Sequence, residues 1–236
     1  MSGNDAGQVP AAGPEGGNPA TALVADIAHQ LRTPVSVLQA GSEAMLDGVT
    51  GLTSRNVESL REESIRLGKM VDDLQQLSAA ESAAVQLALT PCNLDAAVAA
   101  SADALGDIFD QAGVRLLRQL DPVTARCDQR RMHDIITNLL TNAAKYTPHG
   151  GTVTLETRTA GPDAIVRVSD TGIGIPREEL PHITGRFYRG TNSAQVSGSG
   201  IGLAIVDELV RGHHGTMDVI SEEGQGTEVT ITIPRT

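Results

Sequence analysis

The chain has 236 residues, and 40% of them are hydrophobic, so it can form one large domain or two small ones with a real core. The formal net charge is −11, and aromatic residues make up 2% of the sequence. Both values argue against a nucleic acid as the main partner, because phosphate backbones need a basic face and single strands need stacking rings.

The sequence holds two cysteines, Cys92 and Cys127, which are too few for a disulfide framework. We therefore expect two small, buried, reduced thiols, as in a cytosolic protein. No apolar run approaches the about 18 residues that a membrane-spanning helix needs, and no signal peptide is visible. We expect a cytoplasmic chain without membrane contact, which could still be the cytosolic part of a longer, membrane-anchored receptor.

Residues 1–20 contain five glycines and three prolines and almost no large apolar side chain. Such a segment cannot bury enough surface to offset the entropy lost on ordering. We predict that it is a disordered tail or linker.

Residues 21–85 are predicted to form a helical hairpin. Large apolar residues recur at helical spacing up to about Asp47, and a second amphipathic pattern runs from Ser54 to about Ser82. A turn at residues 48–53 separates the two helices. Because two helices alone leave much of their apolar surface in water, two hairpins are expected to pair as a dimeric four-helix bundle.

His29 lies in the first of these helices, two residues from both Ile27 and Leu31. That spacing corresponds to about 200° of helical rotation, so the imidazole is expected on the face away from the core. A neutral, exposed imidazole is a competent nucleophile near neutral pH. An ordinary surface histidine is the alternative that the position alone leaves open.

Residues 86–236 are predicted to form a two-layer α/β sandwich. Residues 83–92 connect it to the hairpin, and Asn93 is the expected N-cap of a helix from Leu94 to about Gln111. Alternating apolar residues bounded by turns predict the strands Val114–Leu120, Val123–Cys127, Thr152–Thr159, Ala164–Ser169, Met217–Ser221 and Glu228–Ile233.

Four short motifs follow one another within residues 138–202. Each motif alone is a weak signal, but this order and spacing rarely arise by chance. The motifs are Asn138-Leu-Leu-Thr-Asn142-Ala-Ala-Lys145-Tyr146, Asp170-Thr-Gly172-Ile-Gly174-Ile, Arg186-Phe187-Tyr188-Arg189 and Gly198-Ser-Gly200-Ile-Gly202-Leu203.

The residue types in these motifs suit a nucleotide. Asp128 is expected to cap the helix of the first motif, on which Asn138 and Asn142 are one turn apart and share a face, with Lys145 close to the same side. Amide oxygens are hard ligands that suit Mg²⁺, which takes few protein groups and relies on phosphate oxygens for the rest. The glycines of the last motif let backbone N–H groups approach a phosphate at the start of a helix. Asp170 ends a predicted strand, where its carboxylate could accept a hydrogen bond from an amine such as adenine N6.

The four motifs resemble the N, G1, F and G2 boxes of the ATP-binding domain of sensor histidine kinases, within the wider GHKL ATPase superfamily. The string Ala28-His29-Gln30-Leu31-Arg32-Thr33-Pro34 resembles the H box of the same kinases, in which the histidine is phosphorylated. The resemblance covers about residues 21–235. It implies a Bergerat-type ATP-binding fold, ATP and Mg²⁺ as cofactors, and a response regulator as partner.

The resemblance also implies roles for single residues. Asn142 would be the Mg²⁺ ligand, and Asp170 with Thr227 would surround the adenine. GHKL members that hydrolyse ATP usually have a water-activating glutamate at the position of Asn138; an amide cannot activate water, so the γ-phosphoryl group is kept for His29. Residues 177–197 resemble a mobile lid. The other expected nucleotide-binding residues are Asn138, Lys145, Tyr146, Gly172, Gly174, Arg186, Arg189, Gly198, Gly200, Gly202 and Leu203.

Two H-box positions beside His29 carry predictions of their own. Gln30 departs from the usual Glu or Asp; it can orient a ring N–H but cannot take its proton, so we expect slow autophosphorylation. Thr33 matches a threonine implicated in positioning water for phosphatase activity toward the regulator. The remaining histidines are expected to be structural or exposed; they are His133, His149, His182, His213 and His214.

We therefore predict an α+β chain with a dimerisation and phosphotransfer domain at residues 21–85 and a catalytic ATP-binding domain at residues 86–236. As a homodimer, it would phosphorylate His29 from Mg-ATP, pass the group to an aspartate of a receiver domain, and also dephosphorylate that domain. Two alternatives stay open. One is a phosphatase-dominant regulator protein; the other is a GHKL ATPase or nucleotide-gated interaction module in which His29 is a bystander.

Overall fold

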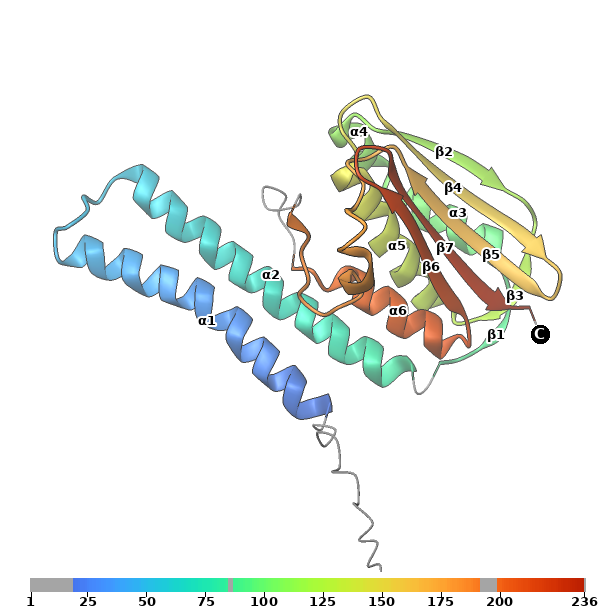
Figure 1. Ribbon diagram of the computed structural model, residues 1–236, viewed down its shortest axis with the longest axis horizontal. Coiled ribbons are helices and arrows are strands. Elements are labelled where there is room, and N and C mark those ends of the chain that lie inside the picture. The colour runs from blue at the N-terminus through green and yellow to red at the C-terminus, as the bar shows by residue number, and fades with distance from the viewer. Residues whose placement is uncertain (1–18, 85–86, 192–198, 236) are drawn as a thin grey trace, which may run out of the picture. The chain divides into compact units, whose positions relative to one another are not determined.

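The computed structural model describes the backbone of residues 19–84, 87–191 and 199–235 (Figure 1). The chain divides into two compact units, Met1–Gly68 and Lys69–Thr236. Most of the predicted tail lies outside the described residues, and the first helix begins at Pro19, just before the predicted start. Within the described residues, no helix is long and apolar enough to cross a membrane.

The first unit holds most of the predicted helical hairpin. Helix α1 spans Pro19–Leu46, and helix α2 spans Ser54–Ala84 and continues into the second unit. The start of α2 is fixed by side chains: the Thr53 hydroxyl accepts from the Asn56 N–H at 3.2 Å, and Asn56 Nδ2 donates to the Gly51 carbonyl at 2.8 Å. The two helices approach closely, since a Cβ added at Gly41 would lie 2.8 Å from Leu60 Cδ2.

The second unit is built on a five-stranded sheet in the order β2-β4-β5-β7-β6. Strands β2 and β4 are parallel, and all other neighbours in this sheet are antiparallel. Helices cover one face (Figure 1), and the buried residues of the two central strands include Val153, Leu155 and Thr157 in β4 and Ala164, Val166 and Val168 in β5. The strands span Arg115–Leu120 (β2), Thr152–Ala160 (β4), Asp163–Asp170 (β5), Thr216–Glu222 (β6) and Gly226–Pro234 (β7).

The helical layer holds the two helices that matter for the site, α5 (Gln129–Tyr146) and α6 (Gly202–Gly212). Their inward faces are apolar and fully buried, as at Ile136 and Leu209. The sequence therefore folds as predicted, into a hairpin followed by a two-layer α/β sandwich. The layer is completed by α3 (Leu94–Asp103) and α4 (Gly106–Ala112). A short 3₁₀ helix, η1 (Leu180–His182), lies between β5 and α6 in the chain.

Two elements differ from the prediction. The helix expected from Leu94 to Gln111 is interrupted between α3 and α4, because Leu105 leaves the helical region (φ −105°, ψ 4°) and turns into the core. Asn93 precedes α3 at the N-cap position, but its side chain makes no cap hydrogen bond. The predicted connector contains a strand, β1 (Thr90–Asn93), which pairs antiparallel with β3 (Thr124–Cys127).

The prediction of two reduced thiols is wrong. Cys92 and Cys127 form a disulfide, with their Cα atoms 6.2 Å apart. The β1–β3 register places Cys92 opposite Ala125, two residues before Cys127, so the two cysteines meet across the small sheet. This pairing depends on β1, which the sequence did not reveal.

Candidate nucleotide-binding site

Helix α5 begins at the predicted cap and carries the two asparagines. Asp128 Oδ1 accepts hydrogen bonds from the N–H groups of Arg130 and Arg131, at 3.1 and 3.2 Å. Asn138 and Asn142 are both half-buried, one turn apart, on the border of the buried face. They are therefore held on one rigid element.

The two amides differ in how they are held. Asn138 Nδ2 donates to the Asp134 carbonyl at 2.9 Å, which fixes the amide plane and leaves Oδ1 pointing off the helix. The side chain of Asn142 makes no hydrogen bond within the described part of the chain. An amide without a protein partner at this place is available to a ligand.

The start of α6 lies beside these amides. A Cβ added at Gly202 would be 2.9 Å from Asn138 Oδ1 and 3.6 Å from Asn142 Nδ2, so only glycine fits this close approach without displacing the amide. The side chain of Ile201 makes no cap hydrogen bond to α6. The first N–H groups of α6 are thus not capped by that residue, and the positive end of the helix dipole lies next to the asparagines.

The third and fourth motifs also meet. Gly200 has a φ of +76°, and a Cβ there would lie 2.4 Å from the Tyr188 carbonyl oxygen. Phe187 itself has a φ of 62°, which is uncommon for a residue with a side chain. The arginines of the third motif, Arg186 and Arg189, are half-buried. The backbone of residues 186–189 is therefore packed against the loop that leads into α6.

Asp170 ends β5 and is held by backbone donors. Its Oδ1 accepts from the N–H groups of Gly172 at 2.8 Å and Thr227 at 3.2 Å. Burial raises the pKa of Asp170, and the hydrogen bonds from these two N–H groups oppose that shift. Within the described residues, Oδ2 has no protein donor, so this oxygen can accept from a ligand.

Two glycines allow the turn after Asp170 to lie against its neighbours. A Cβ at Gly172 would be 2.6 Å from the Tyr146 carbonyl oxygen, and a Cβ at Gly174 would be 2.0 Å from the Glu222 carbonyl oxygen. The Ile173 N–H donates to the same Tyr146 carbonyl at 3.1 Å. The end of α5 and the turn after β5 are therefore joined, which brings the asparagines and Asp170 to one side of the unit.

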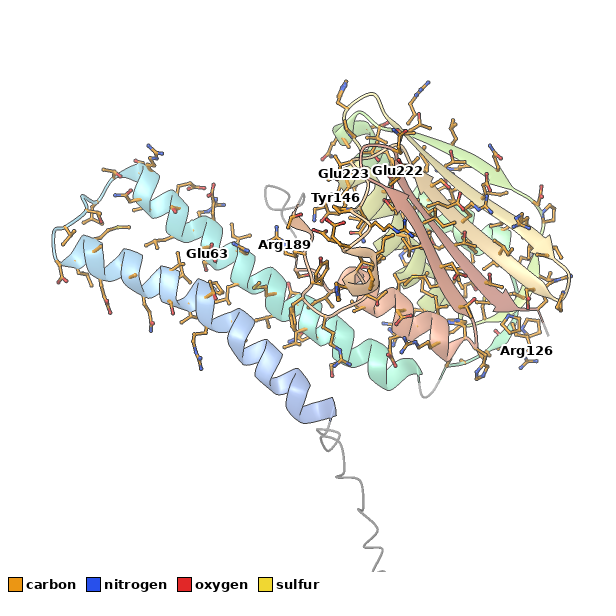
Figure 2. The ribbon with its side chains drawn as sticks, viewed as in Figure 1. Glu63, Arg126, Tyr146, Arg189, Glu222 and Glu223 are labelled. Atoms are coloured by element: carbon orange, nitrogen blue, oxygen red, sulfur yellow. A yellow bond between two sulfur atoms is a disulfide. The ribbon has the colours of Figure 1, made fainter. Side chains whose placement is uncertain are left out.

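Side chains around Tyr146 and Thr227 complete this side of the unit. Lys145 Nζ lies 3.4 Å from the Tyr146 hydroxyl, and Figure 2 shows Tyr146 on the same side as Glu222 and Glu223. Thr227 Oγ1 is hydrogen-bonded to Ser221 Oγ at 2.9 Å. Sequence reasoning missed Ser221, whose place in an alternating strand gives no signal of a role.

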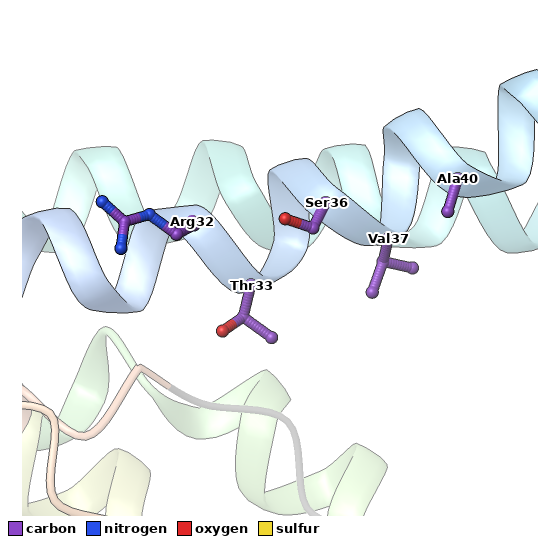
Figure 3. A pocket seen from close by; sticks show the side chains of 5 residues that line it. All are labelled: Arg32, Thr33, Ser36, Val37 and Ala40. Atoms are coloured by element: carbon purple, nitrogen blue, oxygen red, sulfur yellow. The ribbon is translucent and has the colours of Figure 1, made fainter.

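The residues of the first unit are placed on α1. The side chains of His29 and Gln30 lie outside the described ones, so the predicted exposure of the imidazole stays a prediction. Thr33 is exposed and lines a hollow along α1 with Arg32, Ser36, Val37 and Ala40 (Figure 3). Gly198 and the lid residues 192–197 are also outside the described residues.

The donor set fits a magnesium–nucleotide complex better than a protein-only metal centre. Within the described residues, no group of three or more His, Cys, Asp or Glu side chains could hold a metal ion. An amide oxygen at Asn142 beside uncapped helix N–H groups is the type of site in which Mg²⁺ takes most of its ligands from phosphate and water. At Gly174 and Gly202 the neighbouring protein atoms lie so close that a side chain would displace them, so these glycines let the loops of the site pack tightly.

Two family models match the chain. Residues 127–236 match the model described as histidine kinase-, DNA gyrase B- and HSP90-like ATPase, and residues 20–83 match the His Kinase A (phospho-acceptor) domain. Together they cover about three quarters of the chain. The fold and the site thus define an ATPase-type domain that follows a phospho-acceptor domain.

Curated relatives and solved structures agree with these matches. The histidine-protein kinase BaeS of Escherichia coli strain K12 is 33% identical over 90% of this chain and 46% of the relative. The sensor histidine kinase WalK of Bacillus subtilis strain 168 is 30% identical over 90% of this chain and 36% of the relative. The chain therefore spans less than half the length of these two relatives.

Among solved structures, the Acinetobacter baumannii histidine kinase AdeS has a TM-score of 0.66 and 27% identity, covering 88% of this chain and 98% of that one. Full-length ShkA in complex with AMPPNP has a TM-score of 0.64 and 28% identity, covering 90% of this chain and 45% of that one. The chain belongs to the sensor histidine kinases of two-component systems.

Proposed function

We propose that this chain is the kinase core of its sensor: it binds ATP with Mg²⁺, transfers the γ-phosphoryl group to His29, and passes it to an aspartate of a response-regulator receiver domain. One observation carries the proposal. Asn138, Asn142 and the start of α6 converge in the unit that matches the ATPase family, while His29 lies in the segment that matches the phospho-acceptor domain. The AMPPNP complex of the similar protein ShkA supports an adenine nucleotide as ligand.

Each residue of the site has a role in this proposal. The free oxygen of Asp170 accepts from the exocyclic amine of adenine, and Thr227 borders the same base. The glycines at 172, 174, 200 and 202 keep backbone N–H groups close to the nucleotide. Lys145, Tyr146, Leu203, Arg186 and Arg189 border it as well, as does Gly198. When bound at Asn142, Mg²⁺ neutralises phosphate charge.

The chemistry at His29 is a phosphoryl transfer. An imidazole nitrogen with a free lone pair attacks the γ-phosphorus, the bond from phosphorus to the β–γ bridging oxygen breaks, and ADP leaves. The ring proton is released to water, because the Gln30 amide cannot accept it. The Asn138 amide cannot deprotonate water, so hydrolysis does not compete with the transfer.

The proposal includes an assembly and a location. Hairpins from two chains pair as a four-helix bundle, so the active form is a homodimer. In each chain the phosphotransfer domain spans residues 21–85 and the ATP-binding domain spans residues 86–236. The reaction consumes ATP, which places the chain in the cytoplasm, alone or as part of a longer membrane-anchored receptor.

A second activity has its own observation. Thr33 is exposed on α1, about one turn beyond His29, and shares a hollow with Ser36 and Arg32 (Figure 3). We propose that Thr33 positions water for hydrolysis of the regulator's aspartyl phosphate. Thr33→Ala should then lose regulator dephosphorylation and keep autophosphorylation. Loss of both activities, or of neither, would contradict this role.

Incubation with γ-labelled ATP tests the main proposal. The labelled protein should be stable in base and labile in acid, as an N–P bond is, and His29→Ala should take up no label. The matched control is His149→Ala, an exposed histidine of the second unit. If His29→Ala takes up label as the parent does, the assignment is wrong. Steady release of phosphate over many turnovers without a regulator would favour the ATPase alternative.

A further inference from the structure

His213 is the one histidine of the second unit whose ring is almost completely buried, with 1% of its surface exposed among the described residues. It follows the last residue of α6. Its Nδ1 lies 2.7 Å from the Leu209 carbonyl oxygen, to which it donates, and its Nε2 accepts from the Asp128 N–H at 3.1 Å. Both ring nitrogens are therefore used, and only the neutral imidazole fits them.

The partner of His213 is the N-cap residue of α5. Asp128 caps α5 with one carboxylate oxygen, and its other oxygen accepts from the Ala88 N–H at 3.2 Å. The preceding residue, Cys127, is tied to β1 by the disulfide. The start of α5 is thus held by three contacts: with His213, with Ala88 and, through Cys127, with β1. The imidazole of His213 connects this position to α6.

Helices α5 and α6 touch at both ends. At one end Gly202 lies beside Asn138 and Asn142; at the other, His213 bonds to Asp128. The helices therefore run antiparallel. The two spans match, because α6 with its 11 residues rises roughly 16 Å and the segment from Asp128 to Asn138 rises roughly 15 Å. Apolar side chains between the two ends keep the two helices from separating. They restrict the sliding of one helix along the other less strictly than a directed hydrogen bond does.

We infer that His213 is a positioning residue for the nucleotide site: its neutral imidazole fixes the C-terminal end of α6 to the start of α5 and so holds the N-terminus of α6 in register with Asn138 and Asn142. The inference rests on the proposed function, since it concerns the nucleotide of that site. His213 touches no nucleotide itself and acts through the two helices.

Protonation would break this link. An imidazolium carries a proton on Nε2, which would face the Asp128 N–H, and two donors cannot bond to each other. Burial lowers the pKa of His213; the Leu209 carbonyl and the Asp128 carboxylate oppose that shift, and His214 adds to it. These are the titratable groups that face the ring, Asp128 from α5 and His214 from its own segment. The neutral form, and the link with it, is therefore present at neutral pH and lost as the pH falls below the ordinary histidine range.

Two variants of the full chain test the inference by calorimetric titration with Mg-ATP. His213→Leu fills similar space without an acceptor and should bind ATP about tenfold more weakly at about pH 7.5, the effect of one lost hydrogen bond. His213→Gln offers an amide oxygen to the Asp128 N–H and should bind within about threefold of the parent, since it keeps that bond. Between about pH 7.5 and 5.5, parental affinity should fall more than that of His213→Gln, which cannot titrate.

Protonation of ATP affects all variants equally, so the difference between the two pH profiles is what counts. His214→Asn is the control: it is exposed, tolerates the φ of 58° at that position, and should keep both the affinity and the pH profile of the parent. If His213→Leu does not fold, His213→Gln still carries the test through its flattened profile. Identical profiles for the parent and His213→Gln would overturn the inference. No binding of ATP by the parent would instead overturn the proposed function.

Discussion

The two units differ in how much of their apolar side-chain surface they bury. In the second unit, the large apolar residues of α5, β5 and β7 are buried almost completely, as at Ile136 and Ile231. In the hairpin, Val57 is 50% exposed and Leu46 is 85% exposed. The ATPase-type unit thus has a core of its own, whereas the hairpin presents apolar surface that a second copy would cover. We therefore expect the second unit to fold alone and the hairpin, which carries His29, to need a partner.

This contrast predicts that damage to one unit leaves the other intact. Fluorescence can follow the second unit alone, because the chain has no tryptophan and its two tyrosines, Tyr146 and Tyr188, are both in that unit. Tyrosine fluorescence therefore reports on that unit, and the mass of the assembly reports on the hairpin.

Removal of the disulfide should have the largest effect. The bond closes a loop with a sequence separation of 35 residues. Cys92→Ala with Cys127→Ala should lower the free energy of unfolding of the second unit by about 3–4 kcal/mol, because the unfolded chain regains loop entropy. Urea unfolding followed by tyrosine fluorescence measures it. A dithiol reductant should destabilise the parent and leave the double variant unchanged; equal stability of both proteins without reductant would refute the prediction.

The next largest effect is expected at the nucleotide site. Asn142→Ala should slow autophosphorylation by about a hundredfold, since it removes one polar group from the phosphate region. Its side chain makes no hydrogen bond within the described residues, so the urea midpoint should stay near that of the parent. Gln129→Ala, an exposed change on the same helix, is the control for both measurements. A variant that is as destabilised as it is inactive would show a structural role instead.

A charge in the hairpin should act on assembly alone. Val57→Asp should weaken the dimer by about 2 kcal/mol, because an unpaired carboxylate would be buried between hairpins. Sedimentation over a range of concentrations should then show the 24.6 kDa monomer where the parent is dimeric. The exposed Glu62→Gln change should leave the dimer intact. If Val57→Asp moves the tyrosine fluorescence transition, the two units are not independent.

The smallest effect is expected next to the phospho-acceptor. Gln30→Glu supplies a base for the imidazole proton and should speed autophosphorylation by at most about tenfold. Nucleotide affinity, measured by titration, should not change, since residue 30 lies in the other unit. Equal rates for the parent and Gln30→Glu would show that the proton goes to water in both proteins.

Local patterns were sufficient for the elements that carry their own signal. Helices α1, α2 and α5 have amphipathic periodicity, which is strongest in α5, and the hairpin of β4 and β5 has a turn at Gly161-Pro162 that marks its register. The family resemblance also implied that Thr227 lies beside Asp170, and the Thr227 N–H does donate to the Asp170 carboxylate. Their roles toward a nucleotide remain predictions.

Long-range partners explain what the sequence did not reveal. Strand β1 has four residues, including Pro91, and is defined only by its pairing with β3 more than thirty residues later. The disulfide follows from that pairing and was missed with it. The sequence left open whether His213 is structural or exposed, because its burial depends on where α6 ends relative to Asp128. These features depend on contacts between residues far apart in the sequence, so a short stretch of sequence does not reveal them.

The disulfide also closes part of the chain into a covalent ring that contains α3, α4 and β2. A single proteolytic cut inside this ring, for instance at the exposed Asp121-Pro122 turn, would not release either fragment. The cut protein would migrate in a denaturing gel as one band without reductant and as two bands with it. A protease could therefore nick the domain while its two halves remain one molecule.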